Sequence, residues 1–192
     1  MSNETPRIAL LSTEEAKAAA EAVGLPVFMA DLAVFQMMLN HPPLAKALND
    51  LLSTLLWGSK LEAHLRELII MRLGWKYCSD YEWTQHWRVA RGIGMSEEDI
   101  LGVRDWHSYE AYGPAERAVL AATDETIEIG TITDETWEQC VAHVGGTEAL
   151  LEMVVAIGNW RMFASLLRSL KVPLEEGVAS WPPDGKVPSI PG

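Results

Sequence analysis

Apolar residues recur along almost the whole chain at the three- and four-residue spacing that defines one face of an α-helix. In residues 43–57, PLAKALNDLLSTLLW, the leucines fall on one broad face and a proline occupies the first turn, where its missing N–H costs nothing. Residues 147–170 form a longer segment of the same character. No segment supports the assignment of a β-strand. The sequence therefore predicts an all-α protein.

The ends of the predicted helices are marked by capping residues and glycines. Ser12 and Glu15 form a capping box at the start of a helix that ends at Gly24. The further predicted helices cover residues 27–40, 43–57, 60–77, 79–94, 96–104, 113–130, 133–146 and 147–170. Because the connections are short, we expect a single-domain bundle of about eight helices, followed by an irregular, proline-rich tail.

Composition and charge exclude several classes of function. The formal net charge is −12, so we expect neither a nucleic-acid partner nor binding to an anionic membrane surface. The longest apolar runs, such as residues 68–71, are far shorter than the roughly 20 residues of a spanning helix. The N-terminus lacks a basic region followed by an apolar stretch, so no signal peptide is expected and a cytoplasmic location is predicted. The two cysteines form neither a disulfide framework nor a zinc motif, and no metal site is expected.

Residues 77–87, YCSDYEWTQHW, concentrate groups capable of chemistry. Glu82 and His86 are four residues apart, so they share a helix face. Ser79 lies on the same face at the helix N-terminus, where free N–H groups favour an anion. A tight turn near Cys78 would fold this helix back along the preceding one and bring Glu67 toward Glu82 and His86.

Such a cluster can perform proton transfers if water is excluded. Tyr81, Trp75 and Trp83 are expected to wall the site, and Trp87 and Trp160 also fall near it. An apolar wall raises the pKa of a carboxyl group by desolvation, while the neighbouring imidazole can carry the other charge. Two groups with opposed pKa shifts would supply one acid and one base.

A structural interpretation of the same residues is also open. A Glu–His pair such as Glu82 and His86 is common on solvated helix faces and stabilises a helix by only ~0.2–0.5 kcal/mol. Glu67 interrupts a buried apolar run, and a carboxylate there needs a partner. That partner could be a helix N-terminus, Arg66 or Arg72 rather than a catalytic group.

The segment YCSDYEWTQHWRVARGIGMSEEDI and its upstream glutamate resemble the carboxymuconolactone decarboxylase / alkylhydroperoxidase D family. The family pattern is a glutamate, about twelve residues later a Cys-x-x-Cys or Cys-x-x-Glu, and then a histidine. In this register the corresponding residues are Glu67, Ser79, Glu82 and His86. The resemblance covers roughly residues 45–172, which would form the core of one domain spanning 1–192, with 173–192 as the tail.

The resemblance implies an alkylhydroperoxidase D-like (AhpD-like) helical bundle that assembles into homo-oligomers, commonly trimers or hexamers. It also implies a site near a subunit interface and no required metal or organic cofactor. Peroxidases of the family use both cysteines of Cys-x-x-Cys, but these positions are Ser79 and Glu82 here. Cys78 is one residue out of register, which turns it ~100° from the shared face. A dithiol mechanism therefore does not carry over.

The decarboxylase-like branch fits the sequence better. It implies a cofactor-independent lyase or isomerase acting on a small oxygenated carboxylic acid or lactone. His86 would be the general acid/base, Glu82 its acid/base partner, and Glu67 the group that orients or relays protons to the imidazole. Ser79 and its helix N-terminus would bind an oxyanion or a carboxylate, and the pocket would be shaped by Tyr81, Trp83 and Trp75. Two alternatives stay open: a one-cysteine peroxidase that uses Cys78, and a non-catalytic protein that binds a small ligand.

Overall fold

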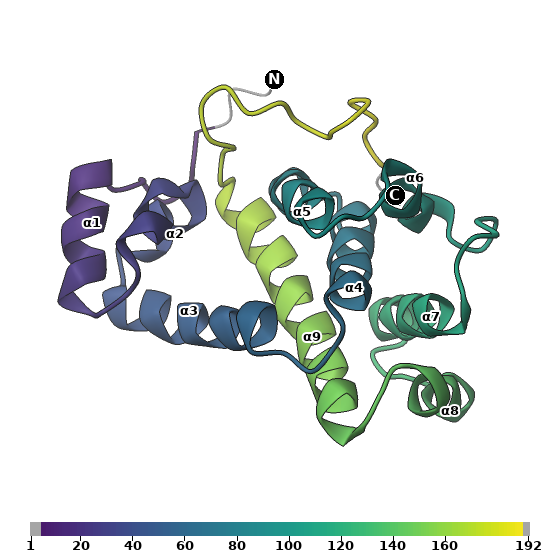
Figure 1. Ribbon diagram of the computed structural model, residues 1–192. Coiled ribbons are helices and arrows are strands. Elements are labelled where there is room, and N and C mark those ends of the chain that lie inside the picture. The colour runs from purple at the N-terminus through teal and green to yellow at the C-terminus, as the bar shows by residue number, and fades with distance from the viewer. Residues whose placement is uncertain (1–4, 190–192) are drawn as a thin grey trace. The chain divides into compact units, whose positions relative to one another are not determined.

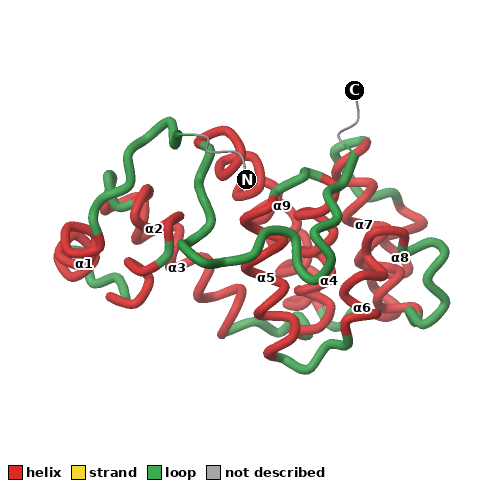
Figure 2. Tube along the Cα trace, turned by 90° about the horizontal axis from the view of Figure 1, so that it is seen from above, coloured by secondary structure: helices red, strands yellow, loops and turns green. Residues whose placement is uncertain are grey.

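The computed structural model describes residues 5–189, and all regular structure in that range is helical (Figures 1 and 2). This part of the chain contains nine α-helices and two short 3-10 helices, joined by turns and loops. The prediction of an all-α fold is therefore confirmed. The helices are α1 (Thr13–Ala22), η1 (Val27–Asp31), α2 (Ala33–Met38), α3 (Pro42–Trp57), α4 (Ala63–Lys76), α5 (Asp80–Gly92), α6 (Glu97–Gly102), η2 (Val103–Asp105), α7 (Pro114–Glu128), α8 (Asp134–His143) and α9 (Thr147–Leu170).

The chain forms two compact units. Among the described residues, the first unit comprises 5–58 together with 166–179, and the second comprises 59–165 together with 180–189. Helix α9 contributes its last turn to the first unit and the rest of its length to the second. All residues that the sequence nominates for chemistry belong to the second unit.

The first unit contains one correction to the predicted helices. Residues 27–40 do not form one helix, because Leu32 has an extended backbone with ψ 130° that separates η1 from α2. This break exposes backbone N–H groups at the start of α2, and the Glu175 carboxylate accepts one of them from Ala33 at 3.0 Å. The capping box at Ser12 and Glu15 is present as predicted.

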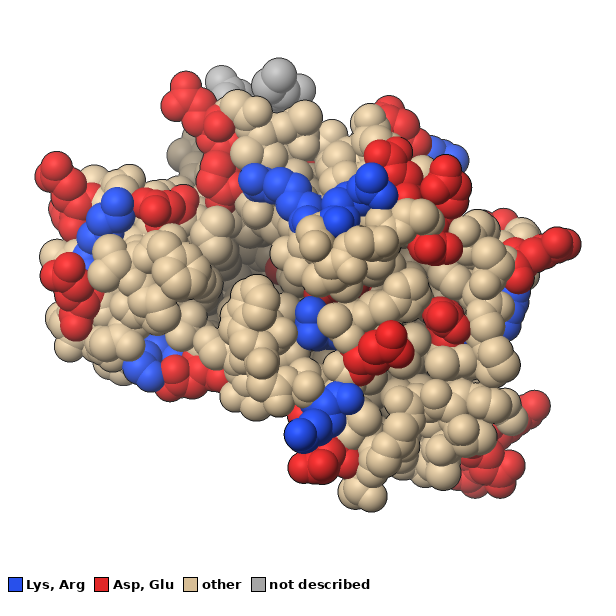
Figure 3. Space-filling view, viewed as in Figure 1, with Lys and Arg blue, Asp and Glu red and all other residues tan. Residues whose placement is uncertain are grey.

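Helix α4 is the central element of the second unit. Every residue from Leu65 to Gly74 is buried, and α4 packs against both α5 and α7, while α7 packs against α8 (Figure 1). Helix α9 is long and apolar enough to cross a bilayer by length and composition alone, and half of its most apolar window is buried inside the molecule. Acidic side chains are scattered over the face shown in Figure 3, which accords with the net charge of −12.

The turn between α4 and α5 sets the geometry of the site. The N–H of Ser79 donates to the carbonyl of Gly74 at 2.8 Å, and the N–H of Cys78 donates to the carbonyl of Trp75 at 3.1 Å. These two bonds form a Schellman motif, with Cys78 in the left-handed position at φ 51°. A Cβ atom on Gly74 would lie 3.2 Å from the backbone nitrogen of Trp83, so the glycine permits close approach of the two helices.

Residues 180–189 of the tail belong to the second unit, contain no helix, and are held near the start of α5. Asp80 accepts hydrogen bonds from the Ser180 hydroxyl at 2.6 Å and from the backbone N–H of Trp181 at 3.1 Å. The indole N–H of Trp83 donates to the carbonyl of Pro182 at 2.7 Å. Trp181 is itself buried, so this segment adds apolar packing as well as hydrogen bonds.

Candidate functional site

Glu67 lies at the centre of the candidate site and has no solvent exposure. Its Oε1 accepts a hydrogen bond from Arg66 Nε at 3.0 Å, and its Oε2 lies 2.7 Å from His86 Nδ1. The fold-back at the α4–α5 turn thus brings together the two helices in the way that the spacing predicts. The Glu67 carboxylate therefore contacts both Arg66, which the sequence offered as a structural partner, and His86, which it offered as a partner in proton transfer.

His86 projects from α5 between α4 and α9. Its Nδ1 faces Glu67, while its Nε2 accepts a hydrogen bond from the indole Nε1–H of Trp160 at 3.1 Å. The Oε2 atom of Glu82 lies 3.6 Å from the same Nε2, just beyond hydrogen-bond distance. The exposed fractions of the His86 and Glu82 side chains are only 12% and 8%, so the pair is largely shielded from bulk water.

Burial dominates the protonation of Glu82. Desolvation, opposed in part by the charge of His86 and reinforced by Glu67, raises the pKa of Glu82 to about 7. This carboxyl group therefore exchanges a proton near neutral pH, where a general acid or base is most effective.

The pKa of His86 is the result of opposed effects. Burial alone would lower it, but the charge of Glu67 and its hydrogen bond to Nδ1, together with the charge of Glu82, raise the pKa above the ordinary 6.5. Arg66 acts in the lowering direction. Glu82 Oε2 lies 3.6 Å from His86 Nε2, so a small movement of either side chain would let a proton pass between them.

Ser79 occupies the N-cap position of α5 but does not cap the helix with its side chain. The residue is 1% exposed, and its hydroxyl oxygen has no hydrogen-bond partner among the described residues. A buried hydroxyl without a partner is unfavourable by roughly 1–3 kcal/mol. Such a group at a helix N-terminus is a suitable donor to an anionic oxygen atom of a ligand.

The tryptophans predicted to wall the site mainly contact one another, and a different indole contacts His86. The ring contacts of Trp83 are with Trp75, Trp87 and Trp181, at centroid distances of 5.3, 6.2 and 5.9 Å. Tyr81 is buried on the first turn of α5. The indole that contacts the His86 ring is Trp160 of α9, at a centroid distance of 5.7 Å and an interplanar angle of 87°.

Trp160 is a contact of His86 that the sequence pattern could not identify. Its position among the tryptophans near the cluster was visible, but its hydrogen bond to His86 joins residues 74 positions apart. Which face of α9 meets α5 depends on tertiary packing, and the apolar character of α9 does not specify it.

The two cysteines differ in environment. Cys78 is half-buried and free in the α4–α5 turn. Cys140 is fully buried in α8, where desolvation raises the pKa of its thiol to about 11 and its Sγ donates to the carbonyl of Ala118 at 3.6 Å. Cys140 is therefore an unreactive core thiol.

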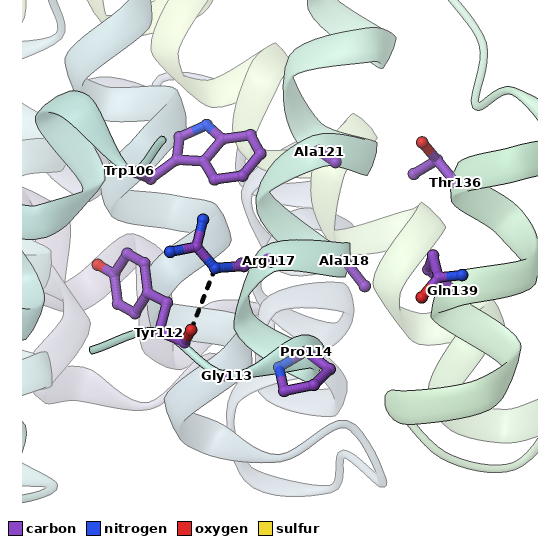
Figure 4. Close-up of a pocket in the computed structure, with 9 residues that line it drawn as sticks. All are labelled: Trp106, Tyr112, Gly113, Pro114, Arg117, Ala118, Ala121, Thr136 and Gln139. Carbon is purple, nitrogen blue, oxygen red and sulfur yellow. Dashed lines mark hydrogen bonds between the residues drawn. The ribbon is translucent and has the colours of Figure 1, made fainter. Parts of the chain in front are cut away.

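Two cavities lie elsewhere in the second unit. The larger, of about 500 Å³, is lined by Trp106, Tyr112, Gly113, Pro114, Arg117, Ala118, Ala121, Thr136 and Gln139 (Figure 4). The Arg117 guanidinium there already donates to the carbonyls of Tyr112 at 3.1 Å and Tyr109 at 2.6 Å. The smaller, of about 430 Å³, lies beside His64 and Glu116. Within residues 5–189 no three His, Cys, Asp or Glu side chains are grouped so that they could hold a metal ion.

Residues 42–125 match the model of the Carboxymuconolactone decarboxylase family. This range runs from α3 into α7 and includes Glu67, Ser79, Glu82 and His86. The resemblance drawn from the sequence is therefore confirmed. No curated protein matches the chain at a significant level.

Solved structures with the same fold include proteins of several descriptions. A protein of unknown function from Agrobacterium tumefaciens, named in relation to the antioxidant defence protein AhpD, is 24% identical with a TM-score of 0.66, covering 71% of this chain and 94% of its own. The debrominase Bmp8, as a Cys-to-Ala variant bound to 2,3,4-tribromopyrrole, is 17% identical with a TM-score of 0.74, covering 92% and 95%.

A third structure is an uncharacterised peroxidase-related protein from Ralstonia eutropha JMP134 with an alkylhydroperoxidase AhpD core. It is 12% identical with a TM-score of 0.72, covering 91% of this chain and 95% of its own. At such identities these likenesses establish the AhpD-like all-helical fold.

Proposed function

We propose that this protein is a cofactor-independent lyase or isomerase that acts on a small oxygenated carboxylic acid or lactone through general acid/base chemistry. The observation that carries the proposal is the chain of contacts from Glu67 through His86 to Glu82, at 2.7 and 3.6 Å. The family match over residues 42–125 supports it.

In a decarboxylation, the bond between the substrate's carboxylate and its neighbouring carbon breaks and CO₂ leaves. The electron pair of that bond moves into an enolate, which then takes up one proton at carbon. Ser79 Oγ–H and the N-terminus of α5 would donate to the enolate oxygen, where negative charge develops. Glu82, whose pKa of about 7 keeps it partly protonated at neutral pH, would supply the proton to carbon, and His86 would relay its replacement.

The low exposure of the pair favours this reading over a non-catalytic ligand-binding role. A binding protein without turnover would leave the Glu82–His86 pair open to solvent, but the exposed fractions of the two side chains are 8% and 12%. A cytoplasmic location, a homo-oligomeric assembly and the absence of nucleic-acid or membrane partners stay predictions from the sequence.

The test is turnover of a set of small lactone acids and keto acids carrying a ¹³C-labelled carboxylate, followed by release of ¹³CO₂ and by NMR of the products. The double variant Glu82→Gln, His86→Asn is expected to lose roughly 10²-fold or more of the wild-type rate. His143→Asn, at an exposed position at the end of α8, serves as the matched control and should keep the full rate. Full turnover by the double variant would defeat the proposal.

The variant Cys78→Ser distinguishes the acid/base hypothesis from the one-cysteine peroxidase hypothesis. Cys78→Ser should leave lyase turnover unchanged. Reduction of an organic hydroperoxide, with a dithiol as the electron donor, that disappears in Cys78→Ser would favour the peroxidase instead.

A further inference from the structure

The hydrogen bond between Trp160 and His86 determines where protons can reside on the imidazole. An indole N–H can only donate, so the bond at 3.1 Å requires an unprotonated lone pair on His86 Nε2. On the other side of the ring, Nδ1 lies 2.7 Å from the carboxylate of Glu67, which can only accept when it is ionised. Both contacts are satisfied together by neutral His86 with its proton on Nδ1.

Protonation of Nε2 would disrupt this arrangement. Two N–H donors, one from His86 and one from Trp160, would then face each other at 3.1 Å, and the buried indole N–H would lose its acceptor. Trp160 is 1% exposed, so water cannot readily replace that acceptor. The alternative position for the same proton is Glu82, whose Oε2 lies 3.6 Å from Nε2.

We infer that Trp160 is a positioning residue of the proposed acid/base site: its indole N–H disfavours a proton on His86 Nε2 and so favours Glu82 as the resting place of the mobile proton. The charged groups that act on His86 are Glu67 and Arg66 from α4 and Glu82 from α5. Trp160 from α9 opposes the two carboxylates, which favour the imidazolium. Trp160 matters for catalysis only if the proposed acid/base function is correct, whereas the state of His86 is measurable without any substrate.

The experiment is NMR of the full chain with ¹⁵N-labelled histidine and tryptophan. In the wild type above the His86 pKa, we expect a proton on Nδ1, a bare Nε2, and a scalar coupling across the bond from Trp160 Nε1–H to His86 Nε2. In Trp160→Phe, which removes the N–H and keeps an aromatic ring, the pKa of His86 should rise by about one unit. If turnover is found, the pKa governing the pH–rate profile should rise by the same amount.

Trp106→Phe is the matched control. Trp106 is also buried, and its indole N–H donates to Asp124 at 3.0 Å, so the variant loses a comparable bond away from His86. The control should leave the pKa of His86 unchanged. An unchanged pKa in Trp160→Phe, or an equal shift in Trp106→Phe, would overturn the inference. A wild-type protein with its proton on Nε2 would also overturn it, even if Trp160→Phe failed to fold.

These readouts are independent of the proposed function. Loss of turnover in the Glu82 and His86 double variant can occur whether or not Trp160 sets the tautomer. Conversely, the coupling between Trp160 and His86 can be observed even if no tested acid is a substrate.

Discussion

Helix α4 carries two buried charged clusters, five residues apart, that differ in how fully their hydrogen bonds are satisfied. Arg72 forms a two-pronged pair with Asp124, at 2.7 and 2.6 Å, and a further N–H of Arg72 donates to the carbonyl of Val103 at 2.6 Å. Asp124 also accepts from the Trp106 indole at 3.0 Å. Both oxygens of this carboxylate are therefore engaged, as in a structural ion pair.

The Glu67 cluster is incompletely satisfied by comparison. Glu82 lies 3.6 Å from its imidazole partner, beyond normal hydrogen-bond distance. At the N-cap of α5, the helix that carries both Glu82 and His86, the buried hydroxyl of Ser79 also has no partner among residues 5–189. Unused donors and acceptors in a shielded site are unfavourable for folding, but a ligand can satisfy them. Helix α4 therefore carries one cluster whose hydrogen bonds are satisfied, at Arg72, and one with an unfilled contact, at Glu67, where the proposed chemistry would take place.

The two clusters also respond to pH in opposite directions. Burial raises the pKa of Glu82 to about 7, whereas Arg72 and the Trp106 indole outweigh burial and lower the pKa of Asp124 below its ordinary 3.8. Stability that depends on Asp124 is present above pH ~4 and is lost as the pH falls through the folded-state pKa. The Glu82 contribution instead declines as the pH rises.

The largest expected effect comes from breaking the satisfied pair. Arg72→Met should lower the free energy of unfolding by about 3–5 kcal/mol, because it leaves the Asp124 carboxylate buried without its cation. Urea denaturation at pH 7 measures the loss. The double variant Arg72→Met, Asp124→Leu should recover much of it. A loss below about 1 kcal/mol in the single variant would mean that the pair is not a structural anchor.

The second prediction concerns pH. Because the folded state holds a proton on Glu82 up to about pH 7 and the unfolded chain releases it near 4.5, the folded state binds more protons in that window, so stability falls as the pH rises. The shift corresponds to about 3 kcal/mol between pH 4.5 and 7. The raised pKa of His86 adds a loss of the same sign above its ordinary 6.5.

Urea denaturation of the wild type and of Glu82→Gln across this range checks the prediction. The variant should gain stability relative to the wild type as the pH rises from 4.5 to 7. Asp124→Asn provides the contrast, since its deficit should shrink only below pH ~4. A difference between wild type and Glu82→Gln that does not vary with pH would show that Glu82 is solvated.

The third prediction tests the electrostatic role of Glu67. Glu67→Gln should lower the pKa of His86 by about one to two units, because it removes the anion 2.7 Å from Nδ1 and leaves burial and Arg66 to act. Histidine ¹⁵N chemical shifts report the change. Glu152→Gln is the control: that carboxylate binds Ser59 and the N–H groups of Lys60 and Leu61, and its removal should not affect His86. Equal effects of both variants would contradict the assignment.

The sequence could predict the part of the site that depends on neighbouring helices. Helical periodicity predicts α4 and α5, and a tight turn near Cys78 predicts that they run back along each other, so that Glu67 can approach the face that carries His86. The distance of 2.7 Å between Glu67 and His86 agrees with that prediction. Local signals also predicted the capping box at Ser12 and the full extent of α9.

The parts that the sequence could not predict depend on contacts between distant segments. The Arg72–Asp124 pair joins residues 52 positions apart, and Trp160 meets His86 from 74 positions away. The rotation of α7 and α9 about their axes decides which side chains meet α4 and α5, and periodicity fixes only the broad apolar face. The break at Leu32 was likewise invisible, because Glu175 caps α2 from 142 positions along the chain.

The smallest expected effect concerns an exposed ion pair, and it tests whether burial or two-pronged geometry makes the Arg72–Asp124 pair stabilising. Arg104 and Asp184 form a two-pronged pair, at 2.7 and 2.9 Å, that resembles Arg72–Asp124 in geometry, but the Asp184 side chain is 44% exposed. Asp184→Asn should therefore lower the free energy of unfolding by only about 0.2–1 kcal/mol, and added salt should reduce the difference further. Urea denaturation at low and high salt measures both quantities.

Residues 180–189 would remain anchored through Trp181 and through the bond from Trp83 to Pro182. A loss as large as that of Arg72→Met would show that a two-pronged ion pair stabilises this fold equally well when it is exposed. The burial of the Arg72–Asp124 pair would then not explain its contribution to stability.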